Sequence, residues 1–190
     1  MAVRAGEQAP AFGENYVQEA KAKQAALSHL PLQWHFIGHL QSNKAADAAS
    51  IFDWVQTVDR PALIEALGRH RPADRPPLDV LVQVNIDDEA SKHGCHPDAV
   101  VALAAAIAAQ SSLALRGLMT IPAPDPDPER RRAAFRRTRA LFDALQHLHP
   151  QVDTLSMGMS EDFAIAIEEG STMVRLGTAL FGPRPAREDA

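Results

Sequence analysis

Short apolar runs rich in β-branched residues alternate with longer segments of helical periodicity along most of the chain. The run 80–84, Val-Leu-Val-Gln-Val, is nearly continuous in apolar residues, which is typical of a parallel strand covered on both faces. The pattern predicts strands at 34–37, 54–58, 80–86, 115–121, 154–157 and 173–181. It predicts helices at 16–30, 42–50, 60–70, 97–110, 128–148 and 161–169.

Several of these boundaries carry start or stop signals. Pro61 and Pro97 each sit at a predicted first turn, where a missing N–H leaves no helical bond unmade. Ser160 is predicted to cap the last helix, with acidic residues after it, and Gly170 to end that helix in a left-handed conformation. The proline-rich stretches 71–77 and 123–128 are predicted to be loops.

The repeated order of strand and helix predicts an α/β fold with a parallel sheet and helical crossovers. The pattern alone leaves two arrangements open, an open doubly wound sheet and a closed (β/α) barrel of the TIM type. No G-x-G-x-x-G follows the first predicted strand, which argues against a dinucleotide-binding open sheet. The chain of 190 residues has no internal repeat and no long linker, so we predict a single domain over 1–190.

Composition narrows the functional classes. A net charge of −5 argues against a general nucleic-acid binder, which needs a basic face. The single cysteine, Cys95, excludes a disulfide framework and fits a reducing compartment. The chain opens without an apolar signal segment, and its most apolar stretch, 99–109, is about half the length of a membrane span. We therefore expect a cytoplasmic protein without membrane or nucleic-acid partners.

Candidate chemistry collects at the ends of the last two predicted strands. Gly158 and Ser160 precede a helix, where free N–H groups, a hydroxyl and the helix dipole suit an anion. Gly177 permits close approach of a ligand to the backbone, and Thr178 adds a donor. Because the loops after the last two strands of a barrel often share a phosphate, we hypothesise one phosphate between the segments Ser156–Ser160 and Gly177–Thr178. Taken alone, each motif is better explained by turn glycines and a helix cap.

Arg175 is a more specific signal, because it lies within an otherwise apolar terminal strand. A guanidinium there needs a partner or a cavity. Two explanations stay open: a structural ion pair with a carboxylate, or contact with a heteroatom of a ligand.

Three other features have ordinary explanations. His35 and His39 are four apart but span a strand and a loop, and the run 93–96, His-Gly-Cys-His, falls short of a closed site, so we predict no metal. Cys95 would need a depressed pKa and an orienting base to act as a nucleophile. The basic segment 130–139 is interpreted as a solvated helix face on an acidic chain, with an anionic partner as the alternative.

Several segments, taken together, resemble the pyridoxal phosphate homeostasis family. They follow the family's order from Phe12 to Gly182, nearly the whole chain, and together they are highly specific. They are F-G-E-N-Y-V-Q-E at 12–19, W-H-F-I-G-H-L-Q-S-N-K at 34–44, V-N-I at 84–86 with Lys92 and Gly94, R-G-L-M-T-I at 116–121, L-S-M-G-M-S at 155–160 with Asp162, and G-S-T-M-V-R-L-G-T-A-L-F-G at 170–182.

The resemblance implies a barrel like the N-terminal domain of alanine racemase and a bound pyridoxal 5′-phosphate (PLP). It implies that the phosphate is held by Ser156, Gly158, Ser160, Gly177 and Thr178. It assigns Arg175 to the pyridine nitrogen and Asn15 to the strand end beside the ring. It also implies a monomeric carrier or regulator of free PLP, without an established turnover reaction, whose partners include PLP and apo PLP-enzymes.

The chain departs from the family pattern at its start. In the family a Schiff-base lysine lies on the first strand, well before the F-G-E-N segment, and none of Lys21, Lys23, Lys44 and Lys92 occupies that place. We therefore expect the first strand and helix to be missing. In that case, either the start codon is misassigned, or the product is poorly soluble. We further expect open sheet edges on the last strand and on the strand before Asn15.

Two other functions compete with a PLP carrier. A PLP-dependent amino-acid racemase needs a base on each face of the substrate's α-carbon. The family lysine is absent, and Tyr16 is the only tyrosine. A remnant of the family that binds no PLP is the second alternative.

Overall fold

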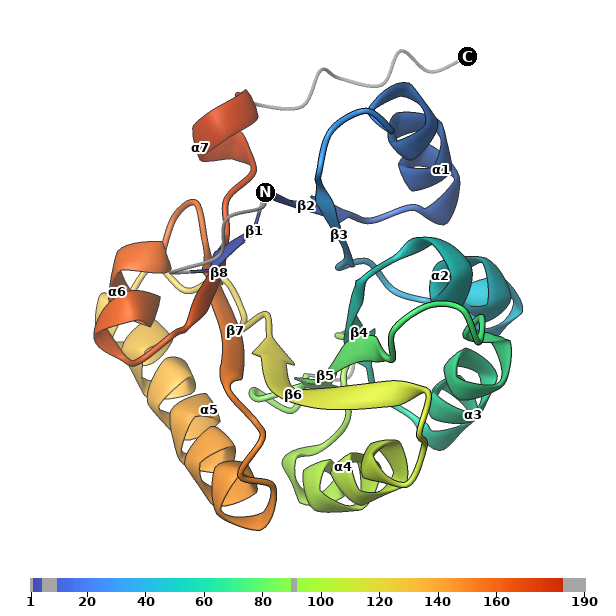
Figure 1. Ribbon diagram of the computed structural model, residues 1–190. Helices are drawn as coiled ribbons and strands as arrows, with labels where there is room; N and C mark the ends of the chain where they lie inside the picture. The colour runs from blue at the N-terminus through green and yellow to red at the C-terminus, as the bar shows by residue number, and fades with distance from the viewer. Residues whose placement is uncertain (1, 5–9, 90–91, 183–190) are drawn as a thin grey trace.

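Seven parallel strands and one short antiparallel strand close into a barrel, and helices surround it (Figure 1). The computed structural model describes residues 2–4, 10–89 and 92–182. The strands are β1 Ala2–Arg4, β2 Ala11–Glu14, β3 Gln33–Phe36, β4 Trp54–Val58, β5 Leu78–Val84, β6 Leu113–Thr120, β7 Thr154–Met159 and β8 Met173–Arg175. The helices are α1 Val17–Ala26, α2 Ala45–Ile51, α3 Pro61–His70, α4 Val100–Ala108, α5 Pro128–Leu148, α6 Phe163–Glu168 and α7 Thr178–Phe181, with 3-10 turns η1 Ser42–Lys44 and η2 Pro97–Ala99.

The closed order of strands confirms the predicted (β/α) barrel and excludes the open doubly wound sheet. Pro61 and Pro97 begin their helical segments as expected, and Gly170 follows α6 with a φ of 88°. The strand predicted at 54–58 and the helix predicted at 128–148 agree with the structure at both ends. The strand β2, which carries no long apolar run, was not among the ranges predicted from periodicity.

Two predictions at the C-terminal end are wrong. The expected strand 173–181 stops at Arg175, and Gly177 then begins the short helix α7, whose Leu180 and Phe181 N–H groups donate to the Gly177 carbonyl. Ser160 does not cap α6, because Asp162 occupies the N-cap position. The Asp162 carboxylate instead accepts a hydrogen bond of 2.7 Å from the Met159 N–H and tightens the turn between β7 and α6.

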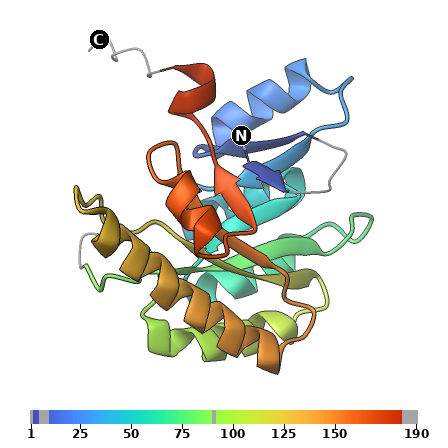
Figure 2. The same cartoon turned by 90° about the vertical axis from the view of Figure 1, so that its left-hand side faces the viewer.

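The expected gap in the barrel is also wrong, because β1 lies between β8 and β2. Its residues pair antiparallel with 173–175 of β8, and Ala2 pairs with Ala11 of β2 (Figure 2). In the sequence, only positions 5–9 lie between Arg4 and Pro10. A connection between two parallel strands needs a crossover of about a dozen residues. A strand so close in sequence to β2 can pair with it only in the antiparallel sense. β1 thereby covers the edge of β8 with three residue pairs and reaches the edge of β2 with one.

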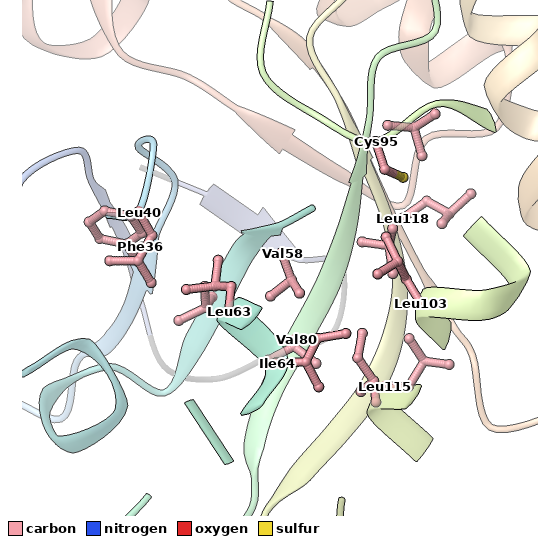
Figure 3. Packing of buried hydrophobic residues seen from close by; sticks show 14 of the residues in the cluster. Phe36, Leu40, Val58, Leu63, Ile64, Val80, Cys95, Leu103, Leu115 and Leu118 are labelled. Atoms are coloured by element: carbon pink, nitrogen blue, oxygen red, sulfur yellow. The ribbon is translucent and has the colours of Figure 1, made fainter. Parts of the chain in front are cut away.

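The apolar core has two parts, one on each face of the barrel wall. The outer part fills the layer between the strands and the helices, where Leu63 and Ile64 of α3 and Leu103 of α4 pack with Val80 and Leu115 (Figure 3). The inner part, inside the barrel, consists of Ala11, Trp54, Leu81, Met119 and Met173. Strands buried on both faces explain the nearly continuous apolar runs in the sequence.

A group of charged side chains closes one end of the barrel interior. The guanidinium of Arg116 lies 5.0 Å from the centre of the Trp54 ring, and it forms ion pairs of 3.2 Å with Asp79 and 2.6 Å with Asp153. Trp54, Asp79 and Asp153 lie at the starts of β4, β5 and β7, at the N-terminal end of the barrel. The opposite, C-terminal end of the barrel is therefore the end left for a ligand, as in other barrels of this type.

We predict that Gly117→Ala destabilises the fold by about 3 kcal/mol. Gly117 has a φ of 150°, and an added Cβ would lie 1.9 Å from the carbonyl oxygen of Thr154 on the neighbouring strand. Urea unfolding should show a lower midpoint for this variant. The control is Gly177→Ala, whose Cβ would meet no atom within 4 Å, so equal midpoints for the two variants would contradict the prediction.

Candidate functional site

The carboxyl ends of β7 and β8 bring Ser160, Gly177 and Thr178 together. Met159 at the end of β7 pairs with Arg175 at the end of β8. Ser160 follows this pair, and its hydroxyl accepts a hydrogen bond of 3.2 Å from the N–H of Ala179 in α7. The two loops named in the phosphate hypothesis are therefore in direct contact.

The first turn of α7 offers donors to a ligand. The N–H groups of Leu180 and Phe181 donate within this turn, and that of Ala179 donates to Ser160. In the described part of the chain, the N–H groups of Gly177 and Thr178 make no hydrogen bond. Thr178 is exposed, and no atom approaches within 4 Å of the place where a Cβ on Gly177 would stand. Two N–H groups and two hydroxyls around open space form an arrangement that can hold a small anion.

Arg175 lies directly inside this rim, with 4% of its surface exposed. One guanidinium nitrogen, Nη1, donates to the Ser156 hydroxyl at 2.7 Å, and the other, Nη2, donates to the Thr120 carbonyl at 2.9 Å. Both acceptors are neutral, so the structural ion pair, one of the two explanations left open by the sequence, does not form among the described residues. Burial lowers the pKa of Arg175 to about 10, partly opposed by Asp162, and the side chain stays cationic at neutral pH.

Ser156 and Gly158 lie apart from the rim. Ser156 is fully buried, and its hydroxyl donates to the Gln56 side-chain oxygen at 2.7 Å in addition to accepting from Arg175. Gly158 has a φ of 94°, and a Cβ there would lie 2.5 Å from the Ala166 Cβ of α6, so its place is fixed by helix packing. The structure thus separates the predicted phosphate set into a rim group and a pair placed deeper in β7.

Asn15 stands at the carboxyl end of β2, on the same side of the barrel as the rim because the two strands share one direction through the barrel wall. It lines a hollow of about 400 Å³ together with Tyr16, His39 and Lys44. A Cβ on Gly38 would lie 2.2 Å from the Asn15 carbonyl oxygen, which explains the glycine in the neighbouring loop. Asn15 is half-buried and available to this hollow.

His35 and His39, for which no metal was predicted, lie in two different environments. His35 is buried inside the barrel and stacks on Trp54, whereas His39 stacks on His93 at the C-terminal end, with ring centres 3.7 Å apart. Burial and the neighbouring His93 lower the pKa of His39, which favours the neutral ring. Within residues 10–89 and 92–182 the side chains form no group of three or more potential metal ligands.

Sequence reasoning missed the polar residues inside the barrel. Gln56 and His35 are both fully buried, and Gln56 lies two residues beyond Trp54, which places it on the same inner face. A signal for His35 exists: several strands carry one polar residue between apolar neighbours, as in W-H-F, V-Q-V, L-S-M and V-R-L, and Gln56 follows the apolar Val55 in the same way. In a barrel such a residue faces the interior, where it needs partners.

The barrel and its strand-end site place the chain in the class of barrels typified by the alanine racemase N-terminal domain. A family profile described as "Alanine racemase, N-terminal domain" matches residues 1–185. An alanine racemase from Clostridium difficile superposes with a TM-score of 0.77 over 94% of this chain and 46% of its own, at 14% identity, and shares the fold.

Closer relatives define the family. The pyridoxal phosphate homeostasis protein of Pseudomonas aeruginosa is 54% identical over 173 residues, covering 91% of this chain and 74% of the relative. That of Escherichia coli K12 is 49% identical over 176 residues, covering 91% and 75%. The structure of PipY from Synechococcus elongatus with PLP bound has a TM-score of 0.82 at 38% identity, covering 94% of this chain and 83% of PipY. The chain belongs to the pyridoxal phosphate homeostasis family, which confirms the resemblance.

Two further observations bear on its environment and reactivity. None of the helices in the described ranges combines the length and the apolar composition that crossing a bilayer would require. Cys95 is buried, and its surroundings raise rather than depress the pKa of its thiol, to about 11 from an ordinary value of 9.0. Burial is the main cause, and Asp59 adds to it. This thiol is therefore a core side chain at neutral pH.

We predict that iodoacetamide alkylates Cys95 roughly 100-fold more slowly in the native protein than in urea at pH 8, because the thiolate fraction falls with the raised pKa. The protonated thiol is favoured in the folded state, so its contribution to stability is present below pH 9 and is lost as the pH rises towards 11. Mass spectrometry of timed samples measures the rate. Similar native and unfolded rates would contradict the raised pKa.

Proposed function

We propose that the protein binds PLP at the carboxyl end of the barrel and serves PLP homeostasis. The observation that carries the proposal is the pairing of two features. A ring of neutral donors at Ser160, Gly177 and Thr178 lies directly outside a buried, cationic Arg175 that has only neutral acceptors in the described chain. A phosphate ester attached to a heteroaromatic ring fits both at once. The names of the relatives and the PLP in PipY support the same ligand.

The residues divide the work of binding. The rim donors hold the phosphate, and Asn15 contributes from the hollow at the end of β2. Arg175 has no acceptor atom, so it can only donate to the ring nitrogen and keeps that nitrogen unprotonated. PLP supplies an electron sink when its ring nitrogen carries a proton, and an unprotonated nitrogen weakens that sink. The site therefore favours storage of the cofactor over carbanion chemistry.

Binding in this chain rests on non-covalent contacts. Lys21, Lys23 and Lys92 each form an ion pair, with Asp47 at 2.8 Å, Glu14 at 2.7 Å and Glu89 at 3.8 Å. Lys44 lies in η1 and lines the hollow with Asn15. These four are the lysines of the sequence, and none of them lies on a strand of the barrel.

We further propose that the protein carries or buffers PLP without turning over a substrate. A racemase needs two bases, and the single tyrosine, Tyr16, precedes α1 and lines the hollow rather than the rim. Delivery of PLP to apo-enzymes, a monomeric state, a cytoplasmic location and a single domain over 1–190 stay predictions. A racemisation assay on free amino acids tests the first point, since measurable turnover would contradict a carrier.

We predict that Ser160→Ala and Thr178→Val each weaken PLP binding about ten-fold, because each removes one hydrogen bond to a charged phosphate. The change in PLP absorbance on titration gives the dissociation constant, and inorganic phosphate should compete. Ser111→Ala is the control, since this exposed serine lies in the turn before β6, at the opposite end of the barrel. Unchanged affinity in both rim variants would contradict the phosphate assignment, and no binding by the unaltered protein would contradict the proposed function.

We predict that borohydride treatment of the PLP-loaded protein leaves no stoichiometric adduct on any lysine. Three lysine side chains form ion pairs with carboxylates, and these contacts compete with attack on the PLP aldehyde. Intact mass measurement followed by peptide mapping checks this. A single stoichiometric adduct, for example on Lys44, would show a covalent link and contradict non-covalent retention.

A further inference from the structure

A chain of hydrogen bonds crosses the barrel interior behind Arg175. Arg175 donates to Ser156, and the Ser156 hydroxyl donates across the barrel to the Gln56 side-chain oxygen on β4, each at 2.7 Å. The Gln56 side-chain nitrogen lies 2.9 Å from His35 Nδ1. His35 Nε2 lies 3.0 Å from the Gln33 side-chain oxygen, at the start of β3. The chain links β8, β7, β4 and β3.

The bonds in this chain have one direction. A guanidinium only donates, so the Ser156 oxygen must accept from Arg175, and its proton must go to Gln56. The Gln56 oxygen is thereby used as an acceptor, which directs its amide N–H towards His35 Nδ1. His35 then carries its proton on Nε2 and donates to Gln33. Reversing any one amide or imidazole would place two donors or two acceptors face to face.

We propose that Ser156, Gln56 and His35 are positioning residues that hold the guanidinium of Arg175 in one orientation at the ligand site. The assignment to a PLP site rests on the proposed function, whereas the restraint on Arg175 does not. Gln56 is central, because it joins the two sides of the barrel and also donates to the Met173 sulfur at 3.2 Å. With Thr120 holding Nη2, the chain fixes both ends of the guanidinium fork.

The burial of these groups makes the restraint strong. Ser156, Gln56, His35 and Thr120 are all fully buried, so water does not replace a lost partner at low cost. The neighbouring Gln83, on β5, offers a matched comparison. It is also buried, but its amide donates to the His93 carbonyl at 3.2 Å and takes no part in the chain.

The test is the rotation of the Arg175 guanidinium about its Cζ–Nε bond, measured by NMR on the full chain labelled with ¹⁵N-arginine. Arg175→Lys assigns the signals. We expect slow rotation in the unaltered protein, about ten-fold faster rotation in Gln56→Met, and little change in Gln83→Met. Equal rates in the two glutamine variants would overturn the proposal. If Gln56→Met fails to fold, Ser156→Ala and Ser156→Thr decide: faster rotation in the first, with slow rotation kept in the second, supports the chain, and any other result contradicts it.

A second readout links the restraint to the ligand. With PLP labelled by ¹⁵N in its ring, the ring-nitrogen chemical shift reports the hydrogen bond from Arg175. Gln56→Met should move this shift, and Gln83→Met should not. Failure of the unaltered protein to bind PLP would reject the proposed function, and the rotation measurement on the ligand-free protein would still decide the positioning role.

Discussion

The structure depends on keeping a guanidinium inside a closed barrel. An isolated cation in a dry interior is strongly disfavoured, and in the described chain Arg175 is given neutral acceptors in place of a carboxylate. Each acceptor must in turn be satisfied, so one buried charge requires Ser156 on β7 and Gln56 on β4. The polar interior at the C-terminal end follows from this requirement.

The two ends of the barrel interior treat arginine differently. At the N-terminal end Arg116 is paired with two carboxylates and stacked on Trp54, so its charge is neutralised within the protein. At the C-terminal end Arg175 keeps its charge without such compensation in the described chain. The ion pairs of Arg116 close the N-terminal end of the barrel. The charge of Arg175 leaves a positive electrostatic potential for a ligand at the rim. This asymmetry explains why one fold can be both a packed core and a binding site.

Much of the fold could be predicted from the sequence, because parallel strands covered on both faces leave a clear apolar record, as at 80–84. The proximity of Ser160 to the turn at Gly177 and Thr178 was predicted, whereas Ser156 lies deeper in the barrel. Three features could not be predicted. The turn at Gly177 follows a segment whose apolar content is equally typical of a strand. The strand β1 is defined by its pairing with neighbours rather than by its own sequence. The hydrogen-bond partner of Gln56, Ser156, lies 100 residues away in the sequence.

The antiparallel strand β1 gives the barrel a seam. Among the described residues it is joined to β2 by one residue pair and to β8 by three, and Ala2 pairs with Arg175 itself. Local unfolding of a protein begins where the fewest bonds must break. The wall of this barrel is therefore expected to open first between β1 and β2, where a single residue pair joins the two strands. Because the same Ala2 also pairs with Arg175, opening of this pair loosens the backbone beside the buried guanidinium.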